Sequence, residues 1–117
     1  MYANLLDNLH RREEAEQKYR KALEIAPKYI NCHYNFALML QNCGKLKEAS
    51  YHFQIVLILN PNHILAHAYF GALLTHIGQV QEAEDHFKKA IFLSPDFLDA
   101  HCNYGGLLLT LNKVEEA

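Results

Sequence analysis

Apolar and small side chains recur along the chain at intervals typical of packed helices. Between residues 30 and 42 they fall at Phe36, Ala37 and Leu40, with His33 one turn earlier, so they share one side of a helix. A second apolar run follows Gly44, a residue that ends helices because it adopts the left-handed conformation at little cost. The pattern predicts one helix over 30–42 and a second over 46–59, packed together through these small and apolar positions.

The same pattern repeats along the sequence with a period of 34 residues, which separates the prolines Pro27, Pro61 and Pro95. The other series with this step are Ala15, Ala49, Ala83 and Ala117; Tyr19, Phe53 and Phe87; Tyr2, Phe36, Phe70 and Tyr104; Ala3, Ala37, Gly71 and Gly105; and Leu6, Leu40, Leu74 and Leu108. Such a period is typical of solenoid proteins. A lone helix pair cannot bury its apolar face, so neighbouring pairs must stack.

These series resemble the motif of the tetratricopeptide repeat (TPR) family, which runs W-x₂-L-G-x₂-Y…A-x₃-F…P. The matching residues are Phe70, Gly71, Leu74, Ala83, Phe87 and Pro95 in one repeat, and Phe36, Ala37, Leu40, Ala49, Phe53 and Pro61 in the repeat before it. The opening tryptophan of the motif is absent, and His33, His67 and His101 stand in its place. The resemblance implies an all-α, TPR-type right-handed α-solenoid of antiparallel helix hairpins.

The repeat register divides the chain into a single array with a partial repeat 1–29, full repeats 30–63 and 64–97, and a partial repeat 98–117. In this register the chain begins inside a first helix and stops as a second helix starts. We therefore expect a break between two helices near residue 10 and another near residue 112. We also expect the chain to be a piece of a longer array, or its ends to be covered by another molecule.

A polar stripe runs along the first helix of each repeat, opposite the packing positions. In TPR proteins this stripe lines the concave groove that holds peptides. The predicted groove residues are Asn4, Asn8, Asn31, Tyr34, Asn35, Leu38, Asn42, Leu65, Tyr69, His76, Asp99 and Asn103. A carboxamide both donates and accepts hydrogen bonds, so an asparagine can hold the backbone of an extended peptide. The alternative is that these asparagines are solvated surface residues without a ligand.

The groove residues also bear on the kind of peptide. TPR co-chaperones that hold an acidic chaperone tail place two cations where this chain has Leu65 and Tyr69, so such a tail is not expected here. Asn35 and Asn103 are similar to the groove asparagines of O-GlcNAc transferase, although Tyr69 interrupts the series. The resemblance therefore favours an extended and fairly neutral segment.

A second surface is expected on the outer, convex side of the array. Tyr51, Ile55, Ile58 and Phe92 form an apolar patch on the second helices, where the first repeat has only polar residues. An isolated solenoid has no use for such a patch. It is either tolerated surface or a contact with another subunit, domain or partner.

The histidines and cysteines raise the question of a metal site. His63 and His67 are four residues apart, a spacing that can share a ligand on a helix. We interpret His33, His67 and His101 instead as partly buried packing residues, so no metal site or other cofactor is expected. The chain has an odd number of cysteines, Cys32, Cys43 and Cys102, and none of them forms a C-x-x-C motif. This pattern indicates reduced thiols and therefore a cytoplasmic location.

Composition excludes several other functions. The net charge of −2 provides no basic patch for nucleic acid, and no apolar run is long enough to span a membrane. No nucleophile with a base, phosphate loop or paired carboxylates in a cleft is recognisable, so no enzyme activity is expected. The sequence predicts a protein-interaction scaffold that binds a peptide in its groove and can self-associate through its ends or its convex patch. The alternative is a substrate-recruiting arm of a larger enzyme, such as a glycosyltransferase.

Overall fold

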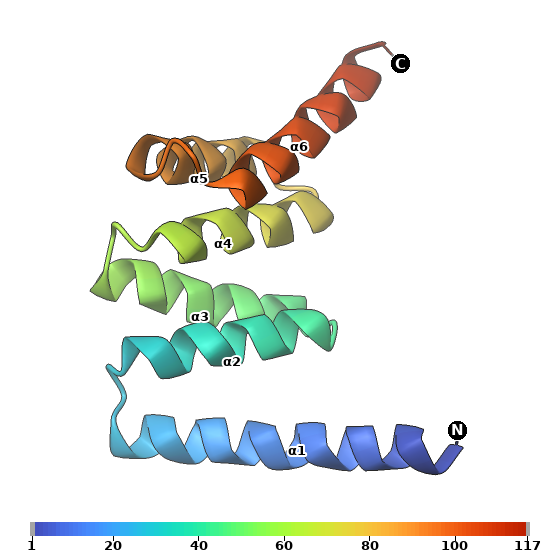
Figure 1. Cartoon of the computed structure of the whole chain (residues 1–117), viewed down its shortest axis with the longest axis vertical. Helices are drawn as coiled ribbons and strands as arrows, with labels where there is room; N and C mark the ends of the chain where they lie inside the picture. Colours follow the sequence, from blue (N-terminus) through green and yellow to red (C-terminus); the bar gives the residue numbers. More distant parts are fainter. Residues whose placement is uncertain (1, 117) are drawn as a thin grey trace.

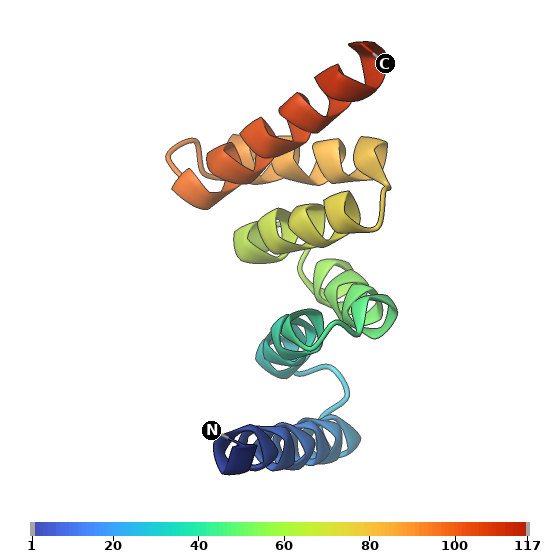
Figure 2. The same ribbon diagram turned by 90° about the vertical axis from the view of Figure 1, so that its right-hand side faces the viewer.

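The computed structural model describes the backbone of residues 2–116 and the side chains of residues 10–111. It contains six helices and no strand in this part of the chain: α1 (Tyr2–Ile25), α2 (Ile30–Asn42), α3 (Leu46–Leu59), α4 (Ile64–His76), α5 (Val80–Leu93) and α6 (Leu98–Glu116). The bounds of α2 and α3 confirm the two helices predicted from the apolar pattern. Figures 1 and 2 show the helices stacked one upon another, with α1 at one end and α6 at the other.

The turns inside the two complete hairpins are built on glycine. Gly44 between α2 and α3 has a φ of 83°, and Gly78 between α4 and α5 has a φ of 86°. After Gly44, the N–H of Lys45 donates to the carbonyl oxygen of Leu40 at 2.9 Å, which closes the helix end in a Schellman motif. A side chain with a Cβ is disfavoured in this left-handed conformation, so the glycine determines where the chain reverses.

No such turn interrupts α1 or α6. The residues one repeat before Gly44 and one repeat after Gly78 are His10 and Asn112, and the helix continues through both positions. The expected breaks near residues 10 and 112 are therefore wrong. Without glycine, the left-handed conformation needed for a reversal is costly, whereas continuing the helix adds a hydrogen bond per residue.

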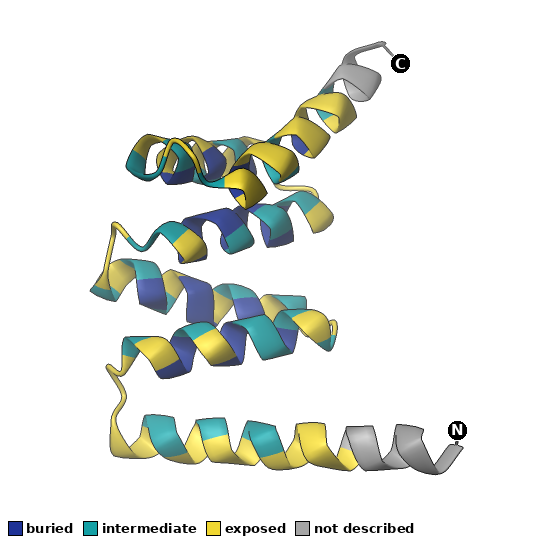
Figure 3. Ribbon diagram, in the orientation of Figure 1, coloured by how far each residue is buried: buried dark blue, intermediate teal, exposed yellow. Residues whose placement is uncertain are grey.

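The core lies between the helices of the two complete hairpins (Figure 3). The predicted packing positions of α2 are all buried, and so are those of α4. Aromatic pairs join each hairpin to its neighbour: Tyr19 with Phe36, Phe53 with Phe70, and Phe87 with Tyr104, with ring centroids 5.2, 5.7 and 5.9 Å apart. The repeats thus stack through one recurring contact, as the sequence period predicts.

Candidate functional site: the groove along the first helices

The predicted groove residues lie on α2, α4 and α6, the first helices of successive repeats, apart from two on α1. Asn31, Asn35 and Asn42 are exposed and Asn103 is half-buried. None of these four carboxamides forms a hydrogen bond with another residue in the described part of the chain. The side chains of Asn4 and Asn8 lie outside the described residues. The amides of α2 are therefore available to a ligand.

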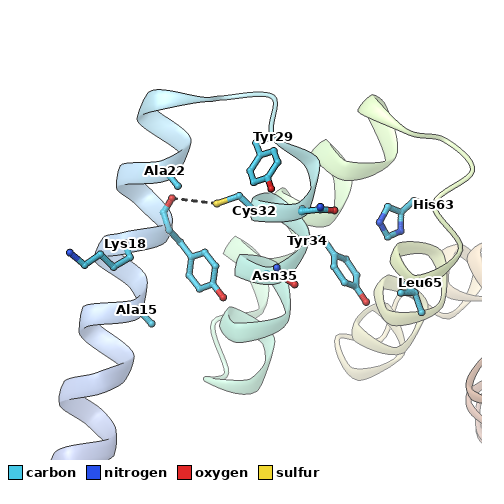
Figure 4. Close-up of a pocket in the computed structure, with 11 residues that line it drawn as sticks. Ala15, Lys18, Ala22, Tyr29, Cys32, Tyr34, Asn35, His63 and Leu65 are labelled. Atoms are coloured by element: carbon cyan, nitrogen blue, oxygen red, sulfur yellow. Dashed lines mark hydrogen bonds between the residues drawn. The ribbon is translucent and has the colours of Figure 1, made fainter.

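A cavity of about 740 Å³ adjoins this surface at the start of α2 (Figure 4). It brings together four of the predicted residues, Asn31, Tyr34, Asn35 and Leu65. The far wall is formed by α1, through Ala15, Lys18, Tyr19 and Ala22, none of which was predicted as a site residue. The Sγ of Cys32 hydrogen-bonds to the carbonyl oxygen of Tyr19 at 3.7 Å and connects the two walls. Residues from three helices thus enclose one hollow.

Two neutral aromatic side chains line the cavity next to the asparagines. The rings of Tyr34 and His63 lie 4.9 Å apart. Burial, and then the nearby Tyr69, raises the pKa of Tyr34 to about 12, so its hydroxyl stays protonated. Burial lowers the pKa of His63, whose Nδ1 accepts a hydrogen bond from the backbone N–H of Ala66 and caps α4. This part of the groove is therefore uncharged except for Lys18.

Tyr69 bridges two of the groove helices instead of facing an open hollow. Its hydroxyl donates to the carboxylate of Asp99 on α6 at 3.1 Å. Burial, followed by this hydrogen bond, raises the pKa of Tyr69. Asp99, the only carboxylate among the predicted groove residues, is therefore hydrogen-bonded to Tyr69. Tyr69 also packs against the core, as do Tyr34 and Leu38.

The remaining predicted residues do not join the first cavity. His76 and Asn103 line a separate hollow of about 180 Å³ between α4 and α6. Asn42 is exposed at the end of α2 and lines neither hollow. The residues predicted as one continuous stripe thus line two separate hollows, and Tyr69 and Asp99 line neither of them.

The predicted convex patch is largely exposed but is not uniform. Tyr51, Ile58 and Phe92 have 60%, 76% and 79% of their surface exposed, whereas Ile55 is half-buried. Tyr51 and Ile55 line a cavity of about 720 Å³ between α1 and α3, which Ile58 and Phe92 do not reach. The ammonium group of Lys89 lies 5.8 Å from the centre of the Phe92 ring. No single hollow unites the four residues.

Two histidine pairs, in which His33, His52 and His67 are buried and His86 is half-buried, were not predicted from the sequence. The Nδ1 atoms of His33 and His52 are 3.0 Å apart, and those of His67 and His86 are 2.9 Å apart. In each pair the first ring also contacts a proline carbonyl through Nε2 at 2.7 Å. The signal was present, because His52 and His86 are separated by the same repeat as His33 and His67. His63, four residues before His67, instead caps α4 through Nδ1.

The tautomers follow from these contacts. A carbonyl oxygen can only accept, so Nε2–H of His33 donates to Pro27, and a neutral ring then has its lone pair on Nδ1. Nδ1–H of His52 therefore donates to His33. The interpretation of His33 and His67 as packing residues is confirmed, since both are buried, whereas His101 is exposed and that part of the prediction is wrong.

Among the described residues, no three metal-ligating side chains converge, and His67 faces His86 rather than His63. No helix in the described part of the chain has the length and hydropathy needed to cross a membrane.

Comparison with known proteins supports the repeat assignment. Two family models described as tetratricopeptide repeat match residues 1–29 and 18–49. None of the curated proteins compared with the chain matches it significantly.

Several solved structures share the fold. The first TPR domain of Spaghetti (RPAP3), bound to the HSP90 peptide SRMEEVD, is 19% identical with a TM-score of 0.83, over 93% of this chain and 86% of that one. MamA from Desulfovibrio magneticus RS-1 is 20% identical with a TM-score of 0.82, over 92% and 60%. YrrB, a TPR protein with an unusual peptide-binding site, is 24% identical with a TM-score of 0.75, over 87% and 53%.

These likenesses concern the fold, and the chain spans only about three fifths of MamA and half of YrrB. They agree with the helix hairpins, the recurring aromatic contacts and the two family matches within the chain. The chain has the all-α solenoid fold of tetratricopeptide repeat proteins, and residues 1–49 match models of that repeat.

Proposed function

We propose that this protein is an interaction scaffold that holds an extended peptide segment along the first helices of its repeats. The observation that carries the proposal is the placement of Asn31 and Asn35 beside an open cavity, with carboxamides that have no partner among the described residues. Solvated helix faces usually carry lysine and glutamate, and this face carries neither on α2. Amides in this position can bind peptide N–H and C=O groups together.

The expected ligand is neutral and extended rather than acidic. The first TPR domain of Spaghetti (RPAP3) was solved bound to the HSP90 peptide SRMEEVD. The resemblance to TPR co-chaperones implies two cations in the groove for an acidic tail of this kind. In this chain Leu65 and Tyr69 occupy the corresponding positions, and the carboxylate of Asp99 would repel an anionic ligand. Tyr34 and Leu65 instead provide apolar contact beside the amides.

A peptide-library pull-down tests the proposal. Changing Asn31, Asn35 and Asn103 to alanine should weaken capture by roughly tenfold or more, because each hydrogen bond contributes about 0.5–1.5 kcal/mol. The matched control changes three exposed glutamines on the second helices, Gln17, Gln54 and Gln81, to alanine. Equal recovery of the same peptides by the asparagine variant and the wild type would show that the groove assignment is wrong.

A second candidate function is that of a substrate-recruiting arm of a larger enzyme. The equivalent positions of Asn35 on α2 and Asn103 on α6 favour this function. The groove would then hold a substrate of that enzyme. The gene sequence beyond residue 117 separates the two functions. A catalytic domain there would favour the arm, and further repeats or a stop codon would favour the scaffold.

A further inference from the structure

The hollow between α4 and α6 lies inside the array, among three consecutive helices. Its volume is about 180 Å³, and α4, α5 and α6 all contribute to its lining. The lining includes the fully buried Phe87 and Leu107 and the small residues Ala72 and Gly106. None of the described residues that line it is a lysine, an arginine or a carboxylate. The hollow is thus a small and largely apolar space.

Small side chains create this hollow at positions that larger side chains fill one repeat earlier. Leu38 of α2 and Tyr69 of α4 are partly buried and pack against the core. Their counterparts 34 residues later are Ala72 and Asn103, which are both smaller and both line the hollow. A Cβ built on Gly106, in the same hollow, would meet nothing within 4 Å. The space that Leu38 and Tyr69 fill between α2 and α4 is therefore left open between α4 and α6.

One carboxamide in the lining is free to bind a polar group of a ligand. Asn103 is half-buried, and its side chain forms no hydrogen bond with another described residue. The hydroxyl of Thr75, in contrast, already donates to the carbonyl oxygen of Gly71 at 2.9 Å. A carboxamide can bind the N–H and the C=O of a peptide together. The hollow therefore combines an apolar space with one group that can hold a peptide backbone beside it.

The size and the lining of the hollow limit what it can hold. An apolar cavity of about 150 Å³ accommodates one benzene molecule, so this hollow has room for a single side chain of leucine size. An acidic or basic side chain would be buried here without an opposite charge, which is costly. The carboxylate of Asp99 does not line the hollow and already accepts a hydrogen bond from Tyr69. The hollow therefore suits a neutral, aliphatic side chain.

We propose that the hollow between α4 and α6 is a specificity subsite for one leucine-sized aliphatic side chain of a bound peptide. This inference rests on the proposed function, because the same peptide lies along the first helices. The side chain of the peptide occupies the place that Leu38 fills one repeat earlier, and Asn103 binds the peptide backbone next to it. The partner is thus a protein with an extended segment that carries a leucine, isoleucine or methionine at this point.

A random peptide library tests the side-chain preference of this subsite. Peptides captured by the wild type should share an aliphatic residue at one position. Gly106→Leu should reduce the capture of these peptides by roughly tenfold or more, because the new side chain takes up the hollow and the aliphatic group of the peptide stays in water. The matched control is Gly105→Leu, on the same helix, where an added Cβ also meets nothing within 4 Å but does not line the hollow. Equal losses in the two variants, or unchanged capture by Gly106→Leu, would overturn the subsite.

Titration with N-acetyl-leucine methylamide, followed by NMR, tests the hollow without a longer peptide. The signals of Ala72 and Thr75 should shift in the wild type and in Gly105→Leu, and they should stay in place in Gly106→Leu. The corresponding glycine derivative, which has no side chain to insert, should cause no shift. If the leucine derivative moved neither signal, or if both derivatives moved them equally, the hollow would not be a site for an aliphatic side chain.

The subsite and the proposed function can fail separately. If changing Asn31 and Asn35 to alanine abolished capture, but the captured peptides showed no aliphatic preference, only the subsite would be wrong. If these two substitutions left capture unchanged while Gly106→Leu reduced it, the role of the α2 asparagines would be wrong and the hollow would remain a binding site.

Discussion

At the scale of single residues, the buried histidine pairs combine packing with hydrogen bonding. Each ring fills space inside a hairpin, the two Nδ1 atoms of a pair contact each other, and Nε2 of His33 and of His67 contacts a proline carbonyl. Buried polar groups that keep such partners avoid a large desolvation penalty. The arrangement requires at least one unprotonated nitrogen between the two rings, which makes the pair sensitive to acid.

The first prediction is a loss of stability between neutral and mildly acidic pH. Burial, and then His33, lowers the pKa of His52 from 6.5 to about 4, while burial also lowers the pKa of His67 and His86. The unfolded chain therefore binds more protons than the folded chain below about pH 6.5, and folding weakens as the pH falls towards about 4. The titration of His52 alone should lower the free energy of unfolding, measured with urea, by about 2 kcal/mol between about pH 7.5 and about pH 5.

Charged side chains near the histidine pairs also influence the pKa values of these histidines. Those facing the pairs are Arg20 and Glu48 at His52, Lys89 at His67, and Glu82 and Asp85 at His86. His52→Phe should reduce the pH dependence, whereas His76→Gln, at an exposed position, should leave it unchanged. If the stability of His52→Phe fell with pH as much as that of the wild type, His52 would not be the source of the acid sensitivity.

At the scale of the elements, glycine decides whether two helices form a hairpin or one long helix. The turns inside the two complete hairpins contain Gly44 and Gly78 at positive φ, and the helix runs on where histidine or asparagine takes their place. The apolar spacing alone could not reveal this, because the residues on either side of His10 follow the same repeat as those around Gly44. The conformational preference of one residue overrode the periodicity.

The second prediction concerns these turns. Gly44→Ala should lower the free energy of unfolding by about 1–2 kcal/mol, because a Cβ is disfavoured at its φ of 83° even though nothing lies within 4 Å. Gly106→Ala, inside α6 and equally free of contacts, should instead raise stability by up to about 1 kcal/mol through helix propensity. Chemical denaturation measures the free energy of unfolding of both variants. If both substitutions changed this free energy in the same direction, the role given to the positive φ of Gly44 would be wrong.

At the scale of the whole molecule, the stack has a well-packed middle and sparsely packed ends. The described residues of α1 include no buried side chain, whereas α2 to α5 contribute most of the core. In a repeat array each unit is stabilised mainly by its neighbours, so an end helix with one neighbour gains less than a central helix. The ends should therefore open more readily than the middle.

Hydrogen exchange at low protein concentration tests this third prediction. Backbone amides in α3 and α4 should exchange about tenfold or more slowly than those in α1 and α6. Protection of α1 equal to that of α3 in dilute wild-type protein would show that the end helices are not weaker.

The sequence by itself determined the repeat, the bounds of α2 and α3, and the residues that pack them, because periodic apolar spacing directly encodes which side of a helix is buried. It also indicated exposed amides on the first helices. Only the tertiary structure decided which groove residues share a hollow, that Tyr69 reaches Asp99, and that His52 faces His33. Those relations depend on how separate helices pack against each other, which local spacing along the chain does not specify.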